Sequence, residues 1–195
     1  MWKKNTNADL DASFTSIKHC WGGVLLLNNQ QLSLSKRDAY MRHIDLPHLV
    51  DNKFQLAYHD THDPVGDKAL LKSKGWSFVN PWEIASTPND CQNYIQRSKA
   101  EISCPKPIFR ELNTGWFSDR SVCYLAAGRP VLAEDTGFSD FMPTDKGLLA
   151  FRDLEEAVAG VNEINANYQN HAKAARNLAE EVFNSEGLCC NGLIF

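Results

Sequence analysis

Short apolar runs recur along the chain and alternate with longer segments of helical composition. The first run, residues 14–17, alternates apolar and polar residues as a half-buried strand does. Five later runs complete the pattern and are predicted as strands: 54–58, 76–79, 100–103, 131–133 and 148–151. Because most connections have room for a helix, the pattern predicts one parallel, doubly wound Rossmann-like α/β sheet of about six strands.

Helix boundaries are predicted from residues that cap or interrupt helices. Ser35 is expected to cap a helix that runs to about Ile44, and Asp63 with Pro64 to open a short helix that ends before Gly75. Further helices are predicted from residue 87 onward, over 117–127, after the capping box at 153–156, and over 168–183.

One domain is expected, because no repeat or low-complexity segment divides the chain. Residues 1–11 are predicted to be a flexible lead-in and residues 12–195 the domain, within which 104–113 is expected to be loop. A doubly wound sheet gathers the loops that follow its strands at one edge, where ligands bind, and its strand order is expected to reverse beside the first strand. The loops expected to share this crevice are 19–23, 80–82, 114–118 and 135–138.

Composition narrows the classes of function. The 195 residues have a net charge of -4, with 43% hydrophobic and 23% charged residues, which is typical of a globular protein and argues against nucleic acid as a partner. The apolar run 24–27 is far too short to span a bilayer, and no signal peptide or transmembrane segment is predicted. The six cysteines contain no Cys-x-x-Cys pair and are interpreted as reduced thiols of a cytoplasmic protein.

The segment 114–139 carries the strongest indication of a ligand site. Gly115 stands where a loop turns into a helix, Gly128 ends that helix, and Pro130 directs the chain into a short apolar strand. Backbone N–H groups at a helix start can hold an anion. The same spacing also fits an ordinary turn of an α/β domain, so it leaves both interpretations open.

The run GWFSDRSVCYLAAGRPVLAEDTGF resembles the donor-binding segment of bacterial glycosyltransferases with the GT-B architecture, in which two Rossmann-like halves face a cleft. Shorter pieces agree with this family in the same order: 34–36, 44–47, 75–76, 94–98 and 148–151. The resemblance covers roughly residues 12–185 and concerns the C-terminal, nucleotide-sugar-binding half of these enzymes only.

The resemblance implies a nucleotide diphosphate sugar as donor substrate, with no other cofactor and no metal ion. The residues expected to bind the donor diphosphate are Lys36, Thr114, Gly115, Trp116, Phe117, Ser118 and Arg120. Those expected near the donor sugar or nucleotide are Gly22, Gly23, Trp82, Asp135, Thr136 and Gly137.

These assignments have structural alternatives. A cation in the first turn of a helix opposes the helix dipole unless an anion binds, but Lys36 could be a solvated surface lysine and Arg120 could pair with Asp119 or Asp135. Trp82 could stack on a base, although covering the core is the favoured interpretation. The HDTHD stretch at 59–63 fits a polar loop better than a metal site.

Two departures from the family limit what the resemblance implies. Many retaining GT-B enzymes carry two glutamates eight positions apart, and the corresponding positions here are Gly115 and Cys123, so no catalytic residue is assigned. The acceptor-binding N-terminal half is absent from these 195 residues. The chain is therefore expected to be inactive alone and to work with a separate N-terminal lobe or as a homodimer; alternatives are a non-catalytic nucleotide-sugar-binding domain and a Rossmann-like interaction module.

Overall fold

The computed structural model describes residues 11–18, 22–58 and 66–183. Six parallel strands form one sheet in the order β5-β4-β1-β6-β7-β8. They are β1 (Phe14–Lys18), β4 (Phe54–Tyr58), β5 (Trp76–Val79), β6 (Ala100–Ser103), β7 (Val131–Glu134) and β8 (Leu148–Phe151). The order reverses between β1 and β6, which confirms the predicted doubly wound sheet.

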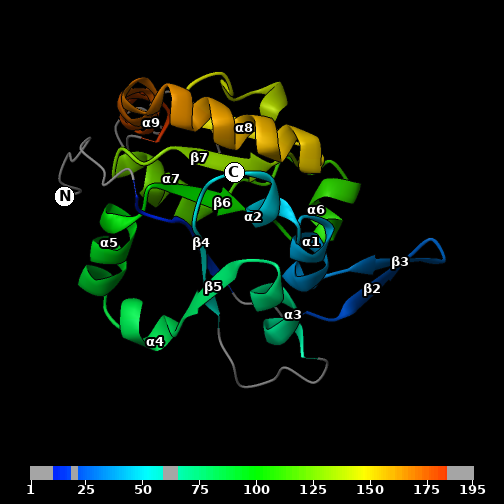
Figure 1. Cartoon of the computed structure of the whole chain (residues 1–195). Coiled ribbons are helices and arrows are strands. Elements are labelled where there is room, and N and C mark those ends of the chain that lie inside the picture. The colour runs from blue at the N-terminus through cyan, green and yellow to red at the C-terminus, as the bar shows by residue number, and fades with distance from the viewer. Residues whose placement is uncertain (1–10, 19–21, 59–65, 184–195) are drawn as a thin grey trace.

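Helices cover both faces of this sheet (Figure 1). The longer ones are α1 (Lys36–Arg42), α3 (Asp67–Ser73), α5 (Pro88–Arg97), α7 (Asp119–Ala126), α8 (Leu154–Ala166) and α9 (Tyr168–Val182). One core cluster joins the sheet to α1, α3 and α8, and a second joins it to α5, α7 and α9. Within β7, Leu132 enters the first cluster while Val131 and Ala133 enter the second, as expected for a strand buried on both faces.

Three short helices were not predicted: α2 (Leu46–Leu49), α4 (Pro81–Ile84) and α6 (Pro107–Glu111). Each has a proline in its first turn, where the missing N–H group costs nothing. Because α6 occupies much of the segment 104–113, the expectation of a loop there was wrong. The helix expected from Asp63 and Pro64 begins at Asp67 in the described residues, and 59–65 lie outside them.

A hairpin was also missed. β2 (Val24–Leu27) and β3 (Gln30–Ser33) pair antiparallel and project from the body beside α1 (Figure 1). Asn28 and Asn29 turn the chain with φ values of 51° and 63°, which is the left-handed pair that a two-residue hairpin requires. All four residues of β2 are exposed, so the aliphatic run 24–27 is a surface strand.

The helices that border the predicted crevice begin close to their predicted starts. Ser35 caps α1 by accepting a hydrogen bond from the Arg37 N–H (3.3 Å), and α7 begins at Asp119 after Ser118. A Cβ atom on Gly22 would lie 2.0 Å from the Leu34 carbonyl oxygen, so glycine lets the chain pass close to the start of α1. Among the described residues, no helix is long and apolar enough to cross a membrane.

Candidate functional site

The sheet topology brings the predicted loops to one edge. Residues 80–82, 114–118 and 135–138 follow the carboxyl ends of β5, β6 and β7, which are parallel. Gly22 and Gly23 follow β1 at the same edge, and residues 19–21 lie outside the described part of the chain. Loops 114–118 and 135–138 are joined directly by two hydrogen bonds. The Gly115 N–H donates to the Thr136 carbonyl (2.7 Å), and the Thr136 hydroxyl donates to the Trp116 carbonyl (2.6 Å).

Two cations from different helices, Lys36 and Arg120, lie near enough to each other at this edge for the charge of one to affect the pKa of the other. Lys36, in the first turn of α1, places its Nζ 5.5 Å from the centroid of the Trp116 ring. Burial, and after it the charge of the nearby Arg120, lower the pKa of Lys36 from 10.5 to about 8. Within the described residues neither cation has a carboxylate within ion-pairing distance: Asp135 pairs with Arg152, and Asp119 caps the Arg120 backbone N–H. The pairing proposed as an alternative for Arg120 is therefore not formed.

A carboxylic acid that the sequence analysis missed lies beneath this pair. Glu101 of β6 is only 2% exposed, and its Oε2 has no hydrogen-bond partner. Burial raises the pKa of Glu101 from 4.5 to about 7, although the Ser121 hydroxyl and the charges of Arg120 and Lys36 offset part of that effect. Near neutral pH, Glu101 therefore carries only a partial negative charge, and the two cations dominate the local field.

The predicted backbone cradle at 114–118 is only partly open. The Gly115 N–H is taken by Thr136, and the Trp116 N–H donates to the Thr114 hydroxyl (3.3 Å). The N–H groups of Phe117 and Ser118 have no partner among the described residues and precede the first turn of α7. These two amides, rather than the whole loop, remain available to a ligand.

The aromatic residues of the site divide into supporting and exposed side chains. Trp116 stacks on Phe109 with ring centroids 4.9 Å apart, and Phe117 packs against Phe138 at 5.2 Å. Trp116 and Phe117 therefore hold loop 114–118 against the rest of the domain. Trp82, on α4, is 67% exposed, so the favoured interpretation that it covers the core was wrong.

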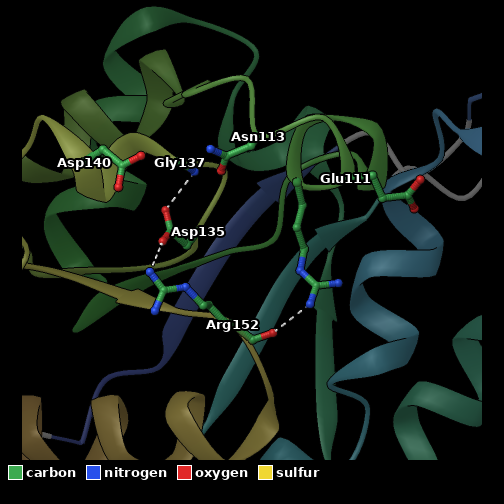
Figure 2. A pocket seen from close by; sticks show the side chains of 7 residues that line it. Glu111, Asn113, Asp135, Gly137, Asp140 and Arg152 are labelled. Carbon is green, nitrogen blue, oxygen red and sulfur yellow. Dashed lines mark hydrogen bonds and ion pairs between the residues drawn. The ribbon is translucent and has the colours of Figure 1, made fainter.

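A polar cavity of about 350 Å³ adjoins the two joined loops (Figure 2). It is lined by Arg110, Glu111, Asn113, Asp135, Gly137, Asp140 and Arg152. Figure 2 shows Asp135 between Gly137 and Arg152: its Oδ1 accepts from the Gly137 N–H (3.0 Å) and its Oδ2 from the Arg152 guanidinium (2.9 Å). Asp135 thus shapes the turn with one carboxylate oxygen and pairs with Arg152 through the other.

Three buried residues at the same edge were also missed. His43 follows α1, Cys104 follows β6 and Glu134 ends β7, and one potential ligand atom of each lies within 4.8 Å of the others. They are 61 and 30 positions apart along the chain, so no sequence motif links them. Only the predicted sheet topology could have indicated this cluster, since Cys104 and Glu134 stand at the carboxyl ends of adjacent strands.

Comparison with known proteins places this geometry in a fold family. No protein-family model and no curated protein sequence matches the chain. Among solved structures, TarM matches with a TM-score of 0.62 and 14% identity over 97% of this chain and 36% of TarM. A Staphylococcus aureus TarM variant in complex with fondaparinux, alpha-GlcNAc-glycerol and UDP matches with a TM-score of 0.64 and 13% identity, over 98% of this chain and 36% of that one.

Sucrose-phosphate synthase from Thermosynechococcus elongatus matches with a TM-score of 0.60 and 13% identity over 94% of this chain and 44% of the synthase. The chain has the fold of one half of a GT-B glycosyltransferase. It spans less than half the length of each of these proteins, in agreement with the half-molecule that its sequence resembles.

Proposed function

We propose that the chain binds a nucleotide diphosphate sugar and supplies the donor-binding half of a glycosyltransferase. The observation that supports this most directly is that Lys36 lies near Arg120, whose charge lowers the pKa of Lys36, while neither cation has a carboxylate ion-pair partner among the described residues. Bringing two like charges together is unfavourable, and an anion bound between them removes that cost. A diphosphate supplies the required charge.

The diphosphate site combines these cations with the start of α7. The free N–H groups of Phe117 and Ser118 lie at the positive end of the helix dipole, and Arg120 stands in the first turn of the same helix. In sugar transfer the diphosphate leaves, so donors already aimed at it stabilise the charge that develops. One structure of this fold was solved with UDP, which adds support for a nucleoside diphosphate at this edge.

The donor sugar is proposed to extend toward the polar cavity. Asn113 and Asp140 line it with side chains that can bond hydroxyl groups, and Gly137 brings the backbone close. Asp135 and Thr136 support these groups from behind, because the Asp135 side chain bonds within the turn and the Thr136 hydroxyl bonds the Trp116 carbonyl of the neighbouring loop. The nucleoside is proposed to lie on the side of Gly22, Gly23 and the exposed Trp82, which leaves the base unassigned.

Transfer is proposed to need a second lobe. Neither family glutamate is present: Gly115 has no side chain, and burial raises the pKa of the Cys123 thiol to about 11, so it is neutral. Holding an acceptor against the donor carbon can supply about 7–11 kcal/mol of a reaction barrier. The lobe that holds the acceptor would come from another part of a longer protein, a separate chain or a second copy.

Calorimetric titration with uridine, guanosine and adenosine diphosphates tests the proposal. Saturable binding of one nucleotide is expected, and Mg²⁺ should not be required for it. Arg120→Ala should weaken binding by about 1.5–3 kcal/mol through loss of a charge-assisted contact. Arg97→Ala is the matched control, because Arg97 is an exposed arginine at the end of α5.

An absence of binding by all three nucleotides would favour the second candidate, an interaction module. The exposed aliphatic strand β2 supports that alternative, since it offers an apolar surface that a partner could cover. Equal affinities of the wild type and Arg120→Ala would instead locate the diphosphate elsewhere.

A further inference from the structure

We propose that His43, Cys104 and Glu134 form a buried zinc site that joins the end of α1 to the carboxyl ends of β6 and β7. All three residues are at most 2% exposed. An imidazole, a thiol and a carboxylate are ligand types that Zn²⁺ accepts, whereas Mg²⁺ and Ca²⁺ prefer oxygen alone. The ligand set therefore indicates zinc.

Unused bonding capacity within the group supports this assignment. Neither ring nitrogen of His43 has a hydrogen-bond partner, and neither does the Oε2 of Glu134. The closest approach of the two side chains is 3.5 Å, from His43 Nε2 to Glu134 Oε1. Leaving buried polar atoms unbonded is costly, and a metal ion bound among these three residues would satisfy one ring nitrogen of His43 and the Oε2 of Glu134.

The arginines beside Glu134 are arranged as an outer shell. Arg42 donates to the Oε1 of Glu134 (2.8 Å), and Arg110 lies 3.5 Å from the same oxygen. Both cations thus contact one oxygen and leave Oε2 for a metal, in the way that outer-shell partners orient a ligating carboxylate.

Charge and distance are compatible with a divalent ion. The two arginines oppose any cation, so the site needs both negative ligands, and a thiolate with a carboxylate neutralise Zn²⁺. Zinc bonds of about 2.0–2.3 Å place tetrahedral ligand atoms about 3.5 Å apart. Starting from atoms that all lie within 4.8 Å, small side-chain rotations close the remaining gap.

The consequence of such a site is positional. His43 directly follows α1, and Lys36 is the first residue of the same helix. A metal bound to His43 would fix α1 against β6 and β7, and with it the position of Lys36. The inference does not depend on the proposed donor binding, because metal binding is measured without nucleotide.

The test measures zinc content and the absorption of the Co²⁺-loaded full chain. We expect about one zinc ion per chain and a thiolate-to-cobalt charge-transfer band. The decisive variant keeps the proposed site intact and replaces every other cysteine by serine, at Cys20, Cys91, Cys123, Cys189 and Cys190. It should retain the band, as should His59→Ala combined with His62→Ala.

Two further variants change the site itself. Cys104→Ser should abolish the band, and Glu134→Gln should weaken zinc binding more than about 100-fold while circular dichroism shows an intact fold. A wild-type chain without the band, a band lost when the other cysteines are replaced, or an unchanged zinc affinity in folded Glu134→Gln would each overturn the inference. The first two results do not depend on whether variants at the buried residues fold.

Discussion

The amino and carboxyl edges of the sheet differ in how many of their buried polar atoms lack a hydrogen-bond partner, and among the described residues Arg129 Nε is such an atom at the amino edge. At the amino edge, the buried Arg129 donates to the Tyr168 hydroxyl (3.2 Å), which itself donates to the Lys99 carbonyl (2.8 Å). His171 Nδ1 accepts from the Gly147 N–H (3.1 Å) at the start of β8. These contacts connect α9 to the strand starts, so this edge is built for stability.

At the carboxyl edge, some polar groups are paired, as Glu134 is with Arg42 and Asp135 with Arg152, but several others are not. Lys36 and Arg120 have no carboxylate partner among the described residues, and both nitrogens of His43 and one oxygen of Glu134 are without hydrogen bonds. Such capacity costs stability unless a ligand uses it. The contrast supports the proposal that ligands bind at the carboxyl edge, and the following predictions challenge that division.

The largest expected effect is at the amino edge. Arg129→Ala removes two charge-assisted hydrogen bonds, to Tyr168 and to the Gln96 carbonyl, and should lower the free energy of unfolding by about 3 kcal/mol. Urea denaturation measures it, with the exposed Arg97→Ala as the control that should change stability by less than about 0.5 kcal/mol. If Arg129→Ala also abolished nucleotide binding in a folded protein, the proposed separation of the two edges would be wrong.

A somewhat smaller effect, an increase in the free energy of unfolding, is expected when Glu101, near Lys36 and Arg120, is replaced by glutamine. The pKa of Glu101 is raised from 4.5 in an unfolded chain to about 7 in the folded one. The contribution of Glu101 to the free energy of unfolding is therefore fully present below about pH 4.5 and is lost as the pH rises through 7. Glutamine does not ionise, so Glu101→Gln does not lose stability in this way. The variant should be more stable than the wild type by about 2–3 kcal/mol at pH 8.5 and nearly equal to it at pH 4.5.

Urea denaturation at both pH values checks this prediction, and the exposed Glu83→Gln provides a matched control that should show no such pH dependence. Destabilisation by Glu101→Gln at pH 8.5 would contradict it, because the carboxylate would then be held ionised by Lys36 and Arg120.

The sequence allowed most of the sheet to be predicted, because the strands are short apolar or alternating segments bounded by residues that break regular structure. The β2–β3 hairpin escaped because β3 contains a single apolar residue, Leu32, and Asn28-Asn29 is a weaker turn signal than Asn-Gly. Helix α6 was hidden by the two prolines at 105 and 107, which suggested loop, although proline is well tolerated in the first turn of a helix.

The candidate site was predictable only where chain order defines it. Parallel strands bring the loops after β6 and β7 to one edge, and resemblance to a family singled out Lys36 and Arg120. Glu101 and the group of His43, Cys104 and Glu134 acquire their properties from burial and from neighbours distant in sequence. Local patterns carry no information on such packing, and a polar residue in a short strand looks the same whether it faces solvent or the core.

The smallest expected effect is the most specific to the carboxyl edge, and concerns the pH dependence of donor binding. The pKa of Lys36 is lowered to about 8, so this cation loses its charge as the pH rises toward 9, while Glu101, with a pKa of about 7, gains negative charge over the same range. Both changes weaken anion binding, and affinity should fall about tenfold between pH 6.5 and pH 9, the equivalent of about 1.4 kcal/mol.

A nucleotide sugar is the appropriate ligand, because its diphosphate is esterified at both ends and does not titrate in this range. Lys36→Arg should keep its affinity at pH 9, since arginine stays charged, and Glu101→Gln should remove the part of the fall that is centred near pH 7. Calorimetric titration of the three proteins at four pH values separates the two contributions. An affinity that is flat across this range in the wild type would show that the diphosphate does not bind beside Lys36, and the carboxyl edge would lose the residue that most distinguishes it from the amino edge.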